Sequence, residues 1–121
     1  MYNERLLDHF QNPRNAGELN SPARVVEVSN PACGDILRLS FIPENSRIGQ
    51  IAFKARGCTA SIACGSALTE LMLGKTCPEL EKVTAADVDL AVGGLIAESK
   101  HAAVLAIDGL KAALKKWRTE Q

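Results

Sequence analysis

Four side chains that can hold a metal ion occur in three separate stretches of the sequence. Cys33 and Asp35 stand two residues apart, Cys58 follows a glycine, and His101 lies far downstream. Two thiolates, a carboxylate oxygen and an imidazole nitrogen suit zinc in a tetrahedral site, and they also suit ferrous iron or an iron–sulfur cluster with mixed ligands. The residue types do not rank these metals. The sequence therefore predicts a thiolate-rich metal site, provided that folding brings the three stretches together.

Each of these residues also has a structural interpretation. Free cysteine is commonly a small buried hydrophobe, Asp35 can bond its own backbone in a turn, and many histidines have no special role. For each residue alone the structural interpretation is at least as strong, and it is their combination, with the following local features, that favours a site. Gly34 permits a turn that aims Cys33 and Asp35 at one point. A helix beginning after Cys58 would lower the pKa of its thiol, and a helix beginning near His101 would favour the neutral ring that binds metal.

Two further cysteines are kept in reserve. Cys64 follows Cys58 by six residues, a rotation of about 240° around a helix, so the two should not share a face. It falls on the apolar stripe with Leu68, which predicts a core position. Cys77 is predicted in a loop before Pro78 as an exposed thiol. No Cys-x-x-Cys pair occurs in the chain, so neither a zinc ribbon nor a thioredoxin-type motif is present.

The elements that must position these residues follow from hydrophobic periodicity. Three strands are predicted, and residues 43–47 give a turn signal between the second and the third, so those two should form a hairpin. Strands first and helices afterwards argue for an α+β fold, a three-stranded antiparallel sheet covered on one face by helices and ending in a long C-terminal helix. The predicted ranges are helix 2–11, loop 16–23, strands 25–28, 36–42 and 51–56, and helices 59–73, 84–92 and 99–117.

Length and composition limit the number of domains and the classes of protein to which the chain can belong. A chain of 121 residues is most simply one domain, 1–121, and 46% hydrophobic with 23% charged residues is typical of a globular protein rather than a disordered one. Lys plus Arg and Asp plus Glu both number 14, so no basic field for nucleic acid is expected. No apolar stretch approaches the ~20 residues that span a membrane. Residues 1–5 do not resemble an export signal, which predicts a cytoplasmic protein with reduced thiols.

Several ungapped motifs follow one another over nearly the whole chain. They are LDHFQNPRNAG from Leu7 to Gly17, NPACGD from Asn30 to Asp35, FKARGCTAS from Phe53 to Ser61, and GKT from Gly74 to Thr76. In this order they resemble the U-type iron–sulfur cluster scaffold family, which comprises IscU, SufU and the amino-terminal domain of NifU. The resemblance implies the same sheet-and-helix fold as the one predicted from periodicity.

The resemblance also implies a function. It is a platform, not an enzyme, on which a [2Fe–2S] cluster is built and handed to apo-proteins. A pyridoxal-phosphate cysteine desulfurase would supply the sulfur, and iron would come from a separate source. By motif, Cys33, Asp35 and Cys58 fall on the family's first three site positions, and His101 matches its last motif. The third motif cysteine is replaced by Ala102.

This replacement leaves two interpretations open. A cluster or iron could be held by the four ligands named above, or could recruit Cys64 or Cys77 by movement. Alternatively, the protein is a zinc- or iron-binding accessory that shuttles sulfur or regulates a cysteine desulfurase without building a cluster. The Leu-Pro-Pro-Val-Lys segment that some members offer to a chaperone is absent, and Gly94 to Glu98 occupies that region. Pairing of two copies of the chain is left open, and no nucleic-acid or membrane partner is expected.

Overall fold

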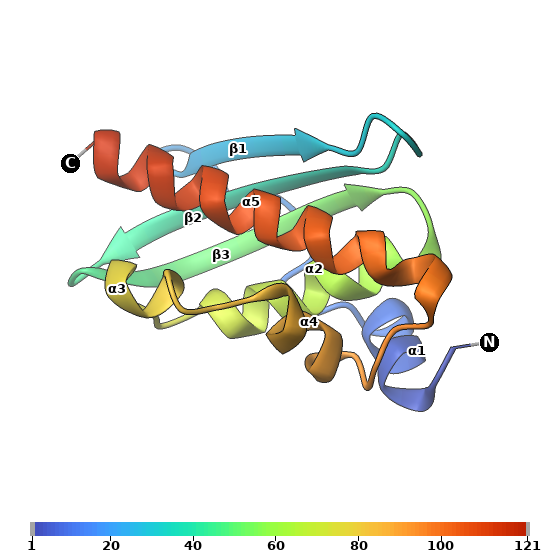
Figure 1. Cartoon of the computed structure of the whole chain (residues 1–121). Coiled ribbons are helices and arrows are strands. Elements are labelled where there is room, and N and C mark those ends of the chain that lie inside the picture. The colour runs from blue at the N-terminus through green and yellow to red at the C-terminus, as the bar shows by residue number, and fades with distance from the viewer. Residues whose placement is uncertain (1, 121) are drawn as a thin grey trace.

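A computed structural model describes residues 2–120 of the chain. Met1 and Gln121, the two ends of the predicted domain, lie outside the described residues. The elements run in the order α1 (Glu4–Gln11), β1 (Arg24–Ser29), β2 (Ile36–Glu44), β3 (Arg47–Arg56), α2 (Thr59–Met72), α3 (Cys77–Leu80), α4 (Ala85–Ala91), the 3₁₀ turn η1 (Ala97–Ser99) and α5 (Lys100–Thr119) (Figure 1).

The three strands form the predicted antiparallel meander in the order β1-β2-β3. The hairpin between β2 and β3 is tighter than predicted, because both strands continue into residues 43–47. Only Asn45 and Ser46 lie between the strands, both with positive φ (53° and 65°), as a two-residue hairpin turn requires. Pro43 is accommodated at an irregularity in the register, a position where a sheet tolerates proline.

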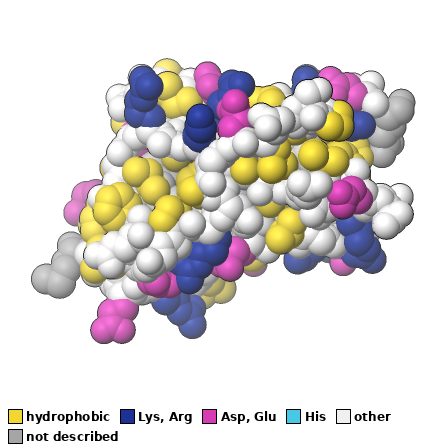
Figure 2. Space-filling view, turned by 180° about the vertical axis from the view of Figure 1, so that it is seen from behind, with side chains coloured by type: hydrophobic (Ala, Val, Ile, Leu, Met, Phe, Trp, Pro, Cys, Tyr) yellow, Lys and Arg dark blue, Asp and Glu magenta, His cyan; other side chains and the backbone are white. Residues whose placement is uncertain are grey.

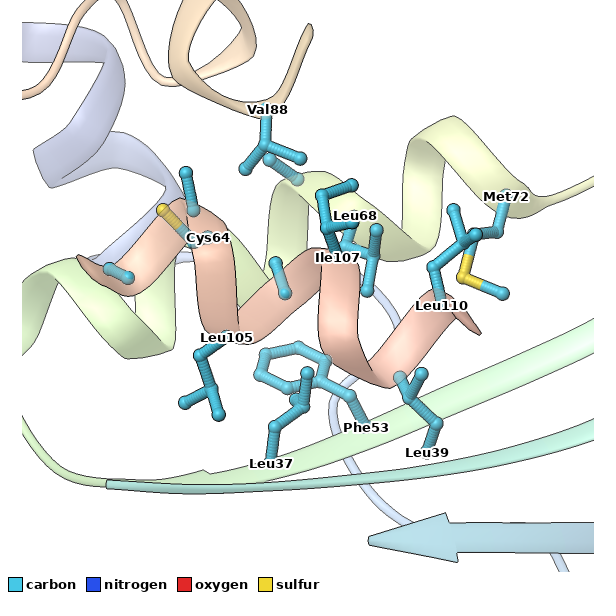
Figure 3. Close-up of a cluster of buried hydrophobic side chains, with 14 of the residues drawn as sticks. Leu37, Leu39, Phe53, Cys64, Leu68, Met72, Val88, Leu105, Ile107 and Leu110 are labelled. Atoms are coloured by element: carbon cyan, nitrogen blue, oxygen red, sulfur yellow. The ribbon is translucent and has the colours of Figure 1, made fainter. Parts of the chain in front are cut away.

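Helices cover one face of this sheet, as the order of the elements predicted. Alternate residues of β2, namely Leu37, Leu39 and Phe41, are buried. Leu37 and Leu39 lie beneath the helices (Figure 3), and Phe41 packs against Trp117 of α5. The close approach depends on two helical glycines. A Cβ on Gly109 of α5 would lie 2.8 Å from Leu37, and one on Gly65 of α2 would lie 2.8 Å from the ring of Phe53. The two helices therefore lie directly on the strands, and their starts are held at one end of the sheet.

Among residues 2–120, no helix lies on the opposite face of the sheet. This face is seen in Figure 2, where hydrophobic side chains lie among lysine, arginine and acidic groups. Arg38 of β2 bonds Glu18 at 2.6 Å and lies 3.6 Å from Glu27 of β1. The edge of β3 is covered by the segment after α1, because Ala16 bridges to Phe53. This side of the molecule thus consists of the outer sheet face and the residue 12–23 loop.

The helices agree with the predictions except at two places. A short helix, α3, had not been predicted; a capping box between Thr76 and Glu79 starts it, so Cys77 lies in its first turn and not in a loop. The turn η1 precedes α5, and Ser99, where the predicted helix 99–117 begins, is the N-cap of α5 but its side chain makes no capping hydrogen bond. Within residues 2–120, every helix is too short or too polar to cross a bilayer.

Candidate metal centre

The three stretches that carry the candidate ligands meet at one end of the sheet. Ile36, the first residue of β2, pairs in register with Arg56, the last residue of β3. Asp35 and Gly57, one step beyond each, are therefore neighbours. The first turn of α5 begins at the same end and brings in His101 (Figure 1).

Two glycines shape the backbone around Asp35. Gly34 has a φ of +77°, and its N–H donates to the carbonyl of Asn30 at 2.7 Å, which closes the predicted turn. Gly57 has a φ of +144°, and a Cβ there would lie only 2.3 Å from Oδ1 of Asp35. Glycine is required at position 57 for two reasons: the backbone has a positive φ, and the Asp35 carboxylate packs against the Cα.

Three atoms that can bind a metal ion lie close together in a triangle. Oδ2 of Asp35 lies 3.5 Å from Sγ of Cys58 and 3.6 Å from Nε2 of His101, and that sulfur and nitrogen are 3.8 Å apart. In a tetrahedral site with metal–sulfur bonds of about 2.3 Å and metal–nitrogen or metal–oxygen bonds of about 2.1 Å, the ligand atoms are about 3.3–3.8 Å from one another. The triangle already has the size of one face of such a site.

Cys33 lies close to two of these three side chains, Asp35 and His101. Its sulfur, a carboxylate oxygen of Asp35 and a ring nitrogen of His101 all lie within 4.8 Å of one another. Cys33 is exposed and Cys58 and His101 are half-buried, whereas Asp35 is only 5% exposed. The four side chains are thus gathered at the surface, with the carboxylate at the floor. Their role as ligands stays a prediction.

Ser61 is a polar member of this cluster that the sequence reasoning did not single out. Its hydroxyl donates a hydrogen bond to Oδ2 of Asp35 and lies 3.3 Å from Sγ of Cys58. It is 4% exposed. Its spacing from Cys58 could have indicated this contact. Cys58 is the N-cap of α2, and the side chain three positions after an N-cap commonly points back towards it.

The surroundings of Asp35 favour its charged form. Burial raises the pKa of this carboxyl, but hydrogen bonds from Ser61, Cys58 and Cys33 act in the opposite direction. The nearby ring of His101 also lowers it, so the pKa of Asp35 lies below its ordinary value. The carboxylate is therefore held ionised, which is the form that coordinates a metal ion.

Cys64 occupies the core position predicted for it. It is 0% exposed and lies among buried hydrophobic side chains including Leu68 and Val88 (Figure 3). Burial, with the negative charges of Cys58 and Asp89 adding to it, raises the pKa of its thiol to about 12. Ala102, the residue after His101, is likewise buried at 1% exposure, and its methyl side chain has no atom that could bind a metal ion.

Cys77 lies at the other end of the molecule. Arg118, in the last turn of α5, bonds Glu81, which directly follows α3. The 17 residues from His101 to Arg118 correspond to roughly 25 Å of helix at 1.5 Å per residue. Cys77 is half-buried there, in contrast to the exposed thiol that was predicted. Neither reserve cysteine is placed to complete the centre.

The other histidine, His9, has a structural role. Its Nδ1 lies 2.8 Å from Oγ of Ser66, and the same oxygen accepts a hydrogen bond from the backbone N–H of Arg14 at 2.8 Å. His9 is 7% exposed. It thereby fastens α1 and the segment that follows it to the middle of α2.

Comparison with known proteins places the chain in a family. The model of the NifU-like N terminal domain matches residues 1–121. Iron-sulfur cluster assembly scaffold protein IscU 1 of Archaeoglobus fulgidus is 41% identical over 94% of this chain and 74% of that protein. Iron-sulfur cluster assembly scaffold protein IscU of Aquifex aeolicus is 38% identical over 99% and 78%. A crystal structure titled only as that of a hypothetical protein shares the fold, with a TM-score of 0.77 and 27% identity over 92% of this chain and 94% of that one. The chain belongs to the family of NifU-like N-terminal domains.

Proposed function

We propose that this chain is an iron–sulfur cluster assembly scaffold, a protein that carries iron and sulfur as cargo and does not turn over a substrate. The cargo, a [2Fe–2S] cluster or iron, is bound by Cys33, Asp35, Cys58 and His101. The observation that carries the proposal is the triangle of sulfur, oxygen and nitrogen, whose edges of 3.5, 3.6 and 3.8 Å match the spacing of ligands around one metal ion.

The arrangement suits reversible binding. Cys58 is the N-cap of α2 and is only half-buried, so its sulfur can be reached from solvent. Asp35 contributes a harder oxygen ligand, which holds soft iron–sulfur cargo less firmly than a thiolate would. Cys33 faces solvent, so an acceptor thiolate can approach from that side and replace the scaffold's ligands one at a time.

The partners follow from this chemistry and from the relatives' names. A cysteine desulfurase supplies sulfur, and apo iron–sulfur proteins receive the product. We place the protein in a reducing compartment such as the cytoplasm, because all four of its cysteines are free thiols. We also propose that residues 1–121 act as a single scaffold domain.

The test is anaerobic reconstitution with ferrous iron and a sulfide source, followed by visible absorption and determination of bound iron and sulfide. We expect the absorption of a [2Fe–2S] centre in the unaltered protein, its loss in Cys33→Ala, and its retention in Cys77→Ala. The second variant is a matched control, since Cys77 is a half-buried thiol at the opposite end of α5. A cluster that forms equally in both variants would contradict the assignment.

A second candidate function has its own observation. Ala102 offers no donor atom, and neither Cys64 nor Cys77 is placed to replace one, so the centre has two sulfur ligands. Two thiolates, one imidazole and one carboxylate make a complete set for a single tetrahedral zinc ion. A zinc-binding accessory that shuttles sulfur or regulates a desulfurase would retain one zinc per chain and form no cluster in the same reconstitution.

A further inference from the structure

We propose that Ser61 is a positioning residue of this centre. Its hydroxyl fixes the Asp35 carboxylate so that one defined oxygen faces Cys58 and His101. The inference rests on the proposed metal-binding function. It assigns a role to a residue that is not itself a ligand.

The two oxygens of Asp35 have different surroundings. Oδ1 packs against the Cα of Gly57, where an added Cβ would come within 2.3 Å of it. Oδ2 accepts hydrogen bonds from Ser61 and Cys58 and lies 3.6 Å from Nε2 of His101. Oδ2 is therefore the carboxylate oxygen that faces both Cys58 and His101.

Ser61 is the one of these hydrogen-bond donors that remains after a metal ion binds. A thiol that coordinates a metal loses its proton to solvent, so Cys58 then ceases to donate to Oδ2. The hydroxyl of Ser61 keeps its proton and can continue to donate it to Oδ2 of Asp35. Held in the first turn of α2 and 4% exposed, it continues to orient the carboxylate while another lone pair of Oδ2 meets the ion.

The effect of such hydrogen-bond partners on metal affinity has a typical magnitude. Loss of a hydrogen bond that orients a metal ligand typically reduces metal affinity by about 10–100-fold. We expect Ser61→Ala to weaken Co²⁺ binding by this factor, measured by competition with a chelator. The expected fall corresponds to about 1.4–2.8 kcal/mol of binding free energy. Ser61→Thr, which retains the hydroxyl, should restore most of the affinity.

Ser66→Ala is the matched control. Ser66 is a second buried serine of α2, and its hydroxyl bonds His9 and the N–H of Arg14 rather than the centre. We expect this variant to lower the free energy of unfolding and to leave Co²⁺ affinity unchanged. A purely structural role for Ser61 would make the two variants behave alike.

The readout specific to positioning is a double-mutant cycle with Asp35→Ala. If Ser61 acts through the carboxylate, Ser61→Ala should change Co²⁺ affinity far less in the Asp35→Ala background than in the unaltered protein. Equal effects in both backgrounds, or unchanged affinity in Ser61→Ala alone, would overturn the inference. A different result, no binding of Co²⁺ by the unaltered protein, would overturn the proposed function and with it this inference. The two failures are therefore distinguishable.

Discussion

Replacing Gly57 with alanine is expected to disable the centre without unfolding the protein. The new Cβ would lie 2.3 Å from Oδ1 and 2.4 Å from Cγ of Asp35. Ordinary van der Waals contact begins at 3.4 Å, so the carboxylate has to retreat by about 1.1 Å. That movement displaces Oδ2 from its present place beside Ser61 and the sulfur of Cys58.

The expected magnitudes follow from these contacts. A non-glycine residue at a φ of +144° costs about 1–3 kcal/mol of stability. A buried carboxylate that loses its hydrogen bonds costs about another 1–3 kcal/mol. A domain of this size is typically stable by about 5–15 kcal/mol, so the variant should still fold. Metal affinity should fall by about tenfold or more, because a ligand and its orienting bond are both displaced.

The assay is urea unfolding of the metal-free protein together with a Co²⁺ competition titration. Gly74→Ala is the matched control, because Gly74 also has a positive φ (+81°) but has open space where the Cβ would go and lies near α3. It should lose about 1–2 kcal/mol of stability and no metal affinity. If Gly57→Ala binds Co²⁺ as tightly as the unaltered protein, the packing of Gly57 against Asp35 does not hold the ligand in place.

Three other variants test the remaining assignments. Asp35→Ala should lengthen the lifetime of a bound cluster, because its most exchangeable ligand is gone; faster loss of visible absorption in the presence of a chelator would contradict this role. Burial, and to a lesser degree the charge of Arg14, lowers the pKa of His9, although Glu70 and Asp8 act in the opposite direction. On acidification the unfolded chain therefore protonates His9 at a higher pH than the folded protein does. The stability that neutral His9 confers is therefore complete above the unfolded pKa of about 6.5 and is lost as the pH falls below it. Urea unfolding at pH 7.5 and 5.5 should show a smaller decrease in His9→Gln than in the unaltered protein, and an equal decrease would show that His9 is not the group concerned. Cys64→Ala should lose about 1 kcal/mol of stability for the small core volume removed and leave Co²⁺ affinity unchanged, whereas a loss of affinity would place its sulfur in the centre.

Much of the fold could be predicted because its signals are local. Leu37, Leu39 and Phe41 alternate within the predicted strand 36–42 and form its buried face, and Thr84, where the helix 84–92 was predicted to begin, caps α4 with its side chain. The turn between β2 and β3 was placed too broadly, because a proline is normally taken as the end of a strand and Pro43 instead sits at a register irregularity. The helix α3 was missed because a single turn is too short to show periodicity.

The sequence by itself determined the ligand types, the motifs that contain them, and the glycines that allow their backbones to turn. Residue types and nearest-neighbour spacing are written in the chain, so Cys33, Asp35, Cys58 and His101 could be named without coordinates. Only the tertiary structure decided that Asp35, Cys58 and His101 stand within 3.5–3.8 Å of one another, that Cys64 is fully buried in the core, and that Cys77 is half-buried in the first turn of α3. It also revealed Ser61, whose importance depends on a contact with a residue 26 positions away. Such contacts are fixed by strand register and helix packing, which act between segments that are distant in sequence and leave no local pattern.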